Sequence, residues 1–233
     1  MIIEGAISVK AAISNKVRDV SCVYINKDKK TKDFNYIRKI CKLNQIDIKE
    51  VDKEVIDNLS QGRSHGGILA EVSSRRSNTF EDGDIFYLEA IEDPFNLGYC
   101  LRTLYALGVK NVILPDKDYE KLDNQLLKSS AGAYDMLNIL YLQNQEDILK
   151  YKEDGYYFYG LYRGENASDI FDCKFKEKAL FVLGGEKRGI SAKILEILDE
   201  QLYISYGSDF RNALNAAAAL DVVATLLYKQ RRK

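Results

Sequence analysis

The chain has 233 residues, and its 46% hydrophobic and 30% charged content is typical of a folded globular protein, not of a disordered one. Its formal net charge of -1 excludes the strongly basic class of nucleic-acid binders, so any contact with a polyanion must come from local patches. Candidate patches are residues 27–32 (KDKKTK), Arg75 with Arg76, and the tail 229–233 (KQRRK), although such runs are also typical of solvated surface.

The cysteines and the apolar stretches indicate whether the protein has a metal site, contacts a membrane or is secreted. The cysteines are scattered without a CxxC pair, and His65 is the only histidine, so we expect reduced thiols and no metal site. The opening segment lacks the apolar centre of a signal peptide. The most apolar stretch, residues 213–228, contains Asn215 and Asp221 and is shorter than the ~20 residues of a membrane span. The sequence therefore predicts a cytoplasmic protein that makes no membrane contact.

The first segment alternates helix and strand patterns. Helices are predicted around residues 7–12, 34–44 and 55–59, and strands at residues 20–25, 46–51 and 67–72. The segment has no glycine-rich phosphate loop and no evident acid pair, so a binding role suits it better than catalysis. Residues 73–84 are polar and rich in turn formers, which predicts a small α/β domain of residues 1–73 and a larger domain of residues 84–233.

The larger domain reads as an α/β fold with a parallel sheet of about five or six strands and crossover helices. The expected strands and helices follow one another along the chain, with a small-residue turn (SSAGA) at residues 129–133. The expected strands are residues 85–90, 111–114, 137–140, 156–161 and 179–183, with a short strand at the start of residues 201–228. The expected helices are residues 97–107, 119–128, 146–152 and 213–228.

Residues 93–108 (DPFNLGYCLRTLYALG) join two of these strands through a turn and a helix. This order places the turn at the carboxyl edge of the sheet, where open α/β sheets bind ligands. Asn96 can bond its own backbone in the turn, and Arg102 falls on a different helix face from the leucines. From position alone, Arg102 reads as a solvated charge.

Two later stretches complete a pattern with residues 93–108. One is LFVLGGEKRGIS at residues 180–191, and the other is QLYISYGSDFRNALNAAAALDVVATLLY at residues 201–228. Together, and in this order, the three stretches resemble the motifs of the SpoU/TrmH family of SPOUT RNA 2'-O-methyltransferases. The resemblance extends from about residue 84 to the C-terminus. More loosely, the first segment is similar to the small ribosomal-protein-like RNA-binding domain of relatives.

The resemblance implies a trefoil-knotted methyltransferase domain that binds S-adenosylmethionine. The residues that match the family's cofactor positions, or lie beside them, are Leu183, Gly184, Gly185, Ile204, Ala213 and Leu214. A glycine-rich turn allows the close backbone approach that such a cofactor needs. Judged without the motif order, Leu183, Ile204 and Leu214 would read as ordinary core residues.

The same comparison implies a catalytic role for Arg102, Asn96, Glu186 and Asn215, and Gly189 matches the glycine that closes the second motif. A guanidinium has a pKa above ~12 and does not readily act as a base. We therefore interpret Arg102 as a clamp for the RNA phosphate that also stabilises the developing alkoxide. A charged residue after a buried strand, such as Glu186, is equally typical of a cavity rim or a helix cap.

The third stretch departs from the family pattern. Ser205 stands where the family has a proline, and Ala213 stands where it has a serine. This departure motivates a rival hypothesis, an RNA-binding protein that kept the fold and lost turnover. An unrelated nucleotide-binding enzyme is a third possibility, but no GxGxxG or Walker-type loop favours it.

The predicted partners are structured RNA and a second copy of the chain. Ribosomal RNA is favoured over transfer RNA by analogy with relatives that carry an extra N-terminal domain. Residues 213–228 have apolar or small side chains on more than one helix face, and family members pair through this region. We therefore expect a twofold homodimer, which a Val223→Glu change should split unless it unfolds the chain.

Overall fold

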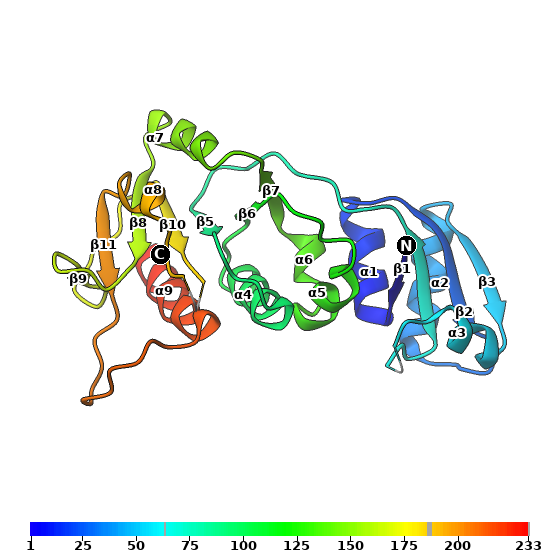
Figure 1. The fold of residues 1–233 in the computed structure, drawn as a ribbon. Helices are drawn as coiled ribbons and strands as arrows, with labels where there is room; N and C mark the ends of the chain where they lie inside the picture. Colours follow the sequence, from blue (N-terminus) through cyan, green and yellow to red (C-terminus); the bar gives the residue numbers. More distant parts are fainter. Residues whose placement is uncertain (63, 186–187, 233) are drawn as a thin grey trace. The chain divides into compact units, whose positions relative to one another are not determined.

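The computed structural model describes residues 1–62, 64–185 and 188–232 (Figure 1). The chain divides into two compact units. Unit 1 contains Met1–Arg76 and Asp118–Met136, and unit 2 contains Ser77–Lys117 and Leu137–Lys233. The chain thus passes between the units after Arg76, after Lys117 and after Met136, and the first passage lies inside the expected linker of residues 73–84.

Unit 1 contains a four-stranded sheet in the order β1-β4-β2-β3. Its strands are β1 (Ile2–Glu4), β2 (Val20–Asn26), β3 (Asp47–Val51) and β4 (Ile68–Val72), and its first helices are α1 (Ala6–Asn15), α2 (Lys32–Leu43) and α3 (Lys53–Leu59). Strands β2 and β3 are parallel, whereas the other pairs are antiparallel. Every helix and strand expected in this segment is present, and β1 is additional because three residues are too few to show a periodicity.

Two helices from the middle of the sequence also belong to unit 1. They are α5 (Asp123–Ser129) and α6 (Ala133–Met136), and both contact α1. Gly132 precedes α6 with a φ of +84°, and a Cβ at this position would lie 3.0 Å from the Cβ of Ala11 on α1. A glycine is therefore needed both for the left-handed turn and for the close approach of α1.

A buried ionic cluster links the N-terminal segment to α5 and α6. The side chain of Arg18 is fully buried and donates hydrogen bonds to Asp123 and, at 2.9 Å, to Asp135. Nε of Arg75 lies 3.7 Å from the same Asp135 carboxylate and donates to the carbonyl of Tyr134. Burial raises the pKa of Asp135 above its ordinary value, although the charge of Arg18 opposes the shift.

Unit 2 contains a seven-stranded sheet in the order β7-β6-β5-β10-β8-β11-β9. All of its paired neighbours are parallel. The strands are β5 (Ile85–Leu88), β6 (Asn111–Pro115), β7 (Asn138–Leu142), β8 (Tyr157–Leu161), β9 (Ser168–Asp169), β10 (Ala179–Leu183) and β11 (Glu200–Tyr203). The expected number of strands, five or six, was too low because β9 has only two residues and is too short to show a sequence pattern.

The centre of this sheet is buried on both faces. Every residue of β5 and of β10 is buried, which explains their continuous apolar sequences IFYL and ALFVL. The helices of unit 2 are α4 (Pro94–Ala106), α7 (Lys150–Glu153), α8 (Ala192–Leu195) and α9 (Ala216–Arg231), with a 3-10 turn at Gln145–Leu149. The helix expected at residues 146–152 is therefore split between that turn and α7.

The C-terminal helix α9 packs against α4 (Figure 1). One face of α9 is buried through Ala217, Leu220, Val223, Ala224 and Leu227. Val223 is 0% exposed within a single chain, so a charge there would disrupt the core and would not report on a dimer. Among the described helices, none combines the length and apolar character needed to cross a bilayer.

Candidate functional site

The carboxyl ends of the central strands meet at one edge of the unit 2 sheet, because the strands are parallel. Strand β5 leads into α4 there, and β10 leads into the glycine turn that begins at Gly184. Strands β8 and β11 lead into loops that begin with Tyr162 and Ile204. Among the cavities that the described residues form at this edge, two are lined by residues that come from several of these segments.

The first cavity, of about 300 Å³, is called the glycine cavity here. Its lining includes every residue that the sequence comparison assigned to the cofactor: Leu183, Gly184, Gly185, Ile204, Ala213 and Leu214. Leu161, Leu202 and Ala219 add further apolar surface, while Arg163 and Arg211 supply positive charge. The glycine cavity therefore combines an apolar slot with exposed backbone, as a cofactor with an aromatic base requires, and has a cationic side that faces solvent.

The glycines of the turn are required by close backbone contacts. A Cβ on Gly184 would lie 2.0 Å from the carbonyl carbon of Gly189, and one on Gly185 would lie 2.0 Å from the carbonyl oxygen of Ala90. Gly189 donates a backbone hydrogen bond of 2.9 Å to Gly185 and has a φ of +63°. Only glycine allows the chain to fold back this tightly and leave its backbone groups open to a ligand.

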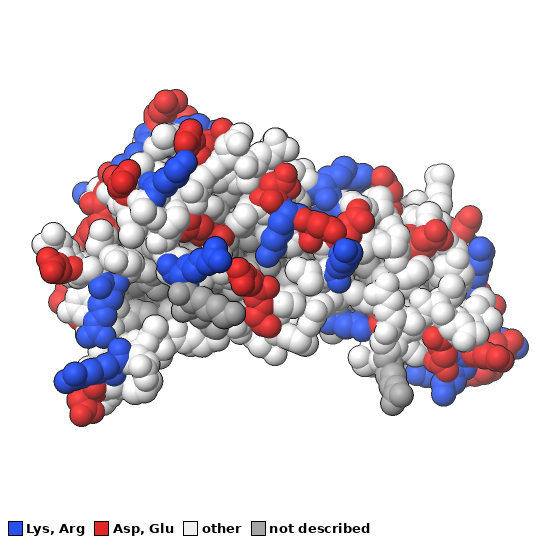
Figure 2. All heavy atoms as spheres, in the orientation of Figure 1, with Lys and Arg blue, Asp and Glu red and all other residues white. Residues whose placement is uncertain are grey.

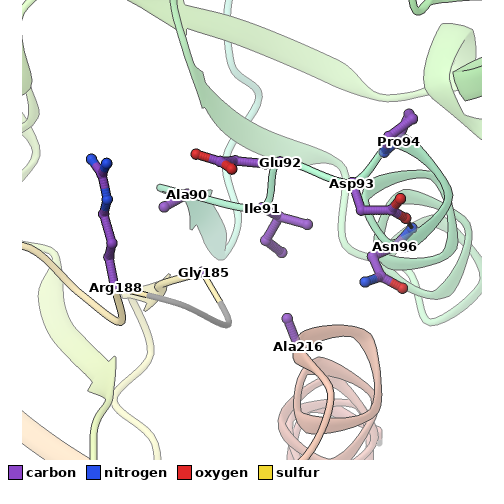
Figure 3. A pocket seen from close by; sticks show the side chains of 9 residues that line it. All are labelled: Ala90, Ile91, Glu92, Asp93, Pro94, Asn96, Gly185, Arg188 and Ala216. Carbon is purple, nitrogen blue, oxygen red and sulfur yellow. Dashed lines mark hydrogen bonds between the residues drawn. The ribbon is translucent and has the colours of Figure 1, made fainter.

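The second cavity, of about 510 Å³, is called the α4 cavity (Figure 3). Asp93 and Asn96 lie side by side at the start of α4, and Ala216 lies at the first turn of α9. The Asp93 carboxylate accepts a 2.8 Å hydrogen bond from the backbone N–H of Asn96 and so caps the helix. Gly185 and Ala216 line both cavities, which are therefore neighbours.

The structure places the predicted catalytic residues at different positions. Asn96 lines the α4 cavity, whereas Arg102 lies on the exposed side of α4 and lines neither cavity. Asn215 caps α9 by accepting a 2.9 Å hydrogen bond from the backbone N–H of Ala217. Glu186 lies outside the described residues. Within one chain, the structure therefore brings Asn96 to the cavities but leaves Arg102 away from them.

Several residues of the site were missed by sequence reasoning. Tyr162 and Arg163 line the glycine cavity, and Arg188, Glu92 and Asp93 line the α4 cavity. A signal for the first pair was available, because Tyr162 and Arg163 directly follow strand β8 at the ligand-binding edge. Arg211, in the loop between β11 and α9, also lines the glycine cavity.

A buried carboxylate supports the same edge. Glu89 follows β5 and accepts a 3.1 Å hydrogen bond from the backbone N–H of Ser191. The amide of Gln145 donates both to Glu89 and, at 3.0 Å, to the hydroxyl of Ser191. This cluster ties the segment after the glycine turn to the end of β5, and so helps to hold the turn in place.

The surface charge is mixed. On the face shown in Figure 2, Lys and Arg side chains alternate with Asp and Glu side chains and do not form one broad positive field. Among the described residues, no group of His, Cys, Asp and Glu side chains is arranged to hold a metal ion. Recognition of a polyanion by the face shown in Figure 2 would therefore depend on a few positions.

Comparisons with known proteins cover almost the whole chain. The SpoU rRNA Methylase family model matches residues 84–225, and the model for RNA 2'-O ribose methyltransferase substrate binding matches residues 2–77. The 23S rRNA (guanosine-2'-O-)-methyltransferase RlmB of Xanthomonas campestris is 26% identical, over 98% of this chain and 96% of the relative.

Solved structures share the fold. The SpoU methyltransferase AviRb from Streptomyces viridochromogenes, in complex with AdoMet, has a TM-score of 0.81 at 16% identity and covers 99% of this chain and 90% of its own. An AdoMet-bound rRNA methyltransferase from Sinorhizobium meliloti has a TM-score of 0.80 at 14% identity, covering 100% of this chain and 88% of its own.

Proposed function

This chain belongs to the SpoU rRNA methylase family, and from that premise we propose that it transfers a methyl group from S-adenosylmethionine to a ribose 2'-hydroxyl of ribosomal RNA. The single observation that carries the proposal is the glycine cavity. Residues that are separated along the sequence, and that were assigned to the cofactor from motif resemblance, all line this one cavity.

The residues of the glycine cavity fit S-adenosylmethionine. The clashes that a Cβ would cause at Gly184 and Gly185 indicate a backbone surface kept bare for close approach. Leu183, Ile204 and Leu214 offer apolar contacts to an adenine ring. Bound there, the cofactor would supply an activated methyl group, and the protein would hold the acceptor hydroxyl in line with it.

The proposed role of Arg102 requires a dimer. Arg102 lines neither cavity of its own chain, and the exposed side of α4 that carries it also presents Phe95, Tyr99 and Tyr105, each at least 42% exposed. A second copy that covers this apolar surface would bring each Arg102 to the site of its partner. There the guanidinium would clamp the RNA phosphate and stabilise charge developing on the ribose oxygen.

The N-terminal segment, residues 1–73, is proposed to bind structured RNA, and residues 84–233 to carry the methyltransferase chemistry. The match of residues 2–77 to a substrate-binding family model supports this division. Removal of residues 1–73 would leave the buried Asp123 and Asp135 without Arg18, so the division is best tested by ultraviolet cross-linking of intact protein to ribosomal RNA. Cross-links confined to unit 2 peptides would contradict it.

A trefoil knot near the C-terminus is also proposed. The resemblance of residues 183–189 and 204–219 to the family's knot motifs supports it, as does the similar fold of the solved relatives. An experimental structure that traces residues 184–191 and 204–215 tests the threading, and an unthreaded path would contradict it.

The activity is tested by incubating the protein with tritiated S-adenosylmethionine and RNA from a strain that lacks the gene. We expect label in ribosomal RNA and, after complete nuclease digestion, in a 2'-O-methylated nucleoside. Cofactor binding without any incorporation, against ribosomal and transfer RNA, would instead support an RNA-binding protein that has lost turnover. That outcome would trace to Ser205 and Ala213, the departures from the family pattern.

A further inference from the structure

Exposed aromatic side chains line the glycine cavity or lie next to a residue that lines it. Tyr162, in the loop after β8, is 39% exposed, and Phe210, in the loop between β11 and α9, is 52% exposed. The ring of Phe210 lies 6.0 Å from the ring of Tyr206, which lines the glycine cavity together with Tyr162. Exposing large aromatic faces to water is unfavourable, so these rings are poorly explained as core packing.

Two arginines accompany the rings. Arg163 lies over the ring of Tyr206, with 5.9 Å between its guanidinium carbon and the ring centroid, and Arg211 follows Phe210 directly. Both arginines are exposed, and neither forms a salt bridge with a carboxylate in the described parts of the chain. Their charges are therefore open to an anionic ligand.

The loop between β11 and α9 is long and reaches beyond the end of β11 (Figure 1). Figure 2, in the same orientation, shows basic side chains on this protruding segment together with acidic ones. Asp209 and Glu165 lie in the same loops as the arginines, so the surface is not uniformly positive. Attraction to a polyanion alone would give weak binding here, and stacking on the rings must supply much of the affinity.

We propose that Tyr162, Arg163, Tyr206, Phe210 and Arg211 form an aromatic rim that stacks an unpaired RNA base next to the cofactor cavity. Single-stranded RNA is recognised by aromatic and guanidinium planes that stack on splayed bases, while arginines contact the phosphates. A base held on the rim would fix its ribose beside the glycine cavity. The inference rests on the proposed function, because it names how that site takes its acceptor.

The test is a comparison of two RNA probes with the full-length protein. One probe is a fluorescein-labelled single-stranded oligoribonucleotide of mixed sequence, and the other has the same backbone with abasic residues. Fluorescence anisotropy of the wild-type protein should show about tenfold tighter binding of the first probe, equivalent to about 1.4 kcal/mol. Phe210→Leu, which keeps an apolar side chain but removes the ring, should abolish most of this preference.

Control measurements distinguish loss of the aromatic rim from damage to the cofactor site or to the fold. Phe171→Leu removes a ring that is 55% exposed and lines neither cavity, and it should leave the preference for bases intact. Arg163→Gln should weaken binding of both probes. Calorimetry should give the Phe210→Leu variant an unchanged affinity for S-adenosylmethionine, because Phe210 does not line the glycine cavity.

A wild-type protein that binds both probes equally would overturn the inference. So would a Phe210→Leu variant that keeps the preference for bases, or one that loses cofactor affinity while RNA binding is unchanged. A base preference that depends on Phe210, in a protein that transfers no methyl group to RNA, would sustain the rim and refute the proposed activity. Methyl transfer to RNA by a protein whose RNA binding does not depend on Phe210 would refute the rim and sustain the proposed activity.

Discussion

Single atoms decide whether the glycine turn can form. A methyl group on Gly184 would lie 2.0 Å from the backbone of Gly189, far inside van der Waals contact. We expect Gly184→Ala to lower the affinity for S-adenosylmethionine by more than about tenfold, because the turn that lines the cavity must open to make room. Isothermal titration calorimetry measures this affinity directly.

The matched control for this prediction is Gly207→Ala. A Cβ on Gly207 meets nothing within 4 Å, and this glycine lies in the neighbouring loop. Its cofactor affinity should stay within about twofold of the wild-type value. If both alanine variants bind the cofactor normally, the close contacts at Gly184 do not matter for the site.

The role of Arg102 can be separated from cofactor binding. We expect Arg102→Ala to reduce methyl transfer by at least about a hundredfold while cofactor affinity is retained, because the side chain lines neither cavity of its own chain. Lys110→Ala, which removes another exposed cation of unit 2, should keep the wild-type rate. An equal loss of cofactor affinity and rate would assign Arg102 to the cofactor site.

The sequence predicted the site unevenly, for physical reasons. Leu183, Gly184 and Ile204 could be found because each occupies a fixed place in an ordered motif. The contacts of Arg163 with Tyr206 could not, because they join loops that follow different strands and are set by how those strands pair. The same holds for Arg18, which reads as an ordinary charged residue until the tertiary structure buries it.

At the scale of elements, the N-terminal strand β1 is tied to its surroundings by Glu4. The Glu4 carboxylate is fully buried and accepts hydrogen bonds from Lys128 and from the backbone N–H groups of Gln61 and Gly62. Burial favours the neutral acid, but these hydrogen bonds and the charge of Lys128 outweigh it, so the pKa of Glu4 lies below its ordinary value of 4.5.

A carboxylate with a lowered pKa stabilises the folded state above its unfolded pKa and loses this effect as the pH falls through the folded value. Glu4→Gln should therefore lower the free energy of unfolding by about 2 kcal/mol near neutral pH and flatten its decline below pH 4.5. Urea denaturation over a pH series measures both effects. Glu71→Gln, an exposed change on β4, should alter neither one.

The cluster around Arg18 fixes α5 and α6 to the N-terminal segment. We expect Arg18→Met to lower the free energy of unfolding by about 4 kcal/mol, because it removes the cation that is hydrogen-bonded to the buried Asp123 and Asp135 and leaves only the more distant Arg75 near Asp135. Arg38→Met removes an exposed pair with Glu50 and should cost less than about 1 kcal/mol. Equal losses in the two variants would mean that burial of the cluster is unimportant.

At the scale of the whole molecule, the sequence predicts pairing through residues 213–228, and we propose that the interface includes the exposed side of α4, which packs against this helix. Tyr99 is 50% exposed in a single chain, so a charge there should disturb an interface and leave the fold intact. We expect Tyr99→Glu to give a monomer by light scattering, with an unchanged circular dichroism spectrum. A wild-type protein that is already monomeric at micromolar concentration with cofactor bound would contradict the dimer.

Because the chain passes three times between its units, unit 1 cannot be removed by a single truncation of the chain. A domain joined by one linker can be gained, lost or exchanged in a single genetic event, whereas unit 1 is assembled from both sides of a unit 2 segment. Deleting residues 1–76 would strip α5 and α6 of their apolar cover and leave Asp123 and Asp135 without Arg18. Such a shortened chain should aggregate, so the segment proposed to bind RNA is an obligatory part of the folded molecule and not an optional attachment.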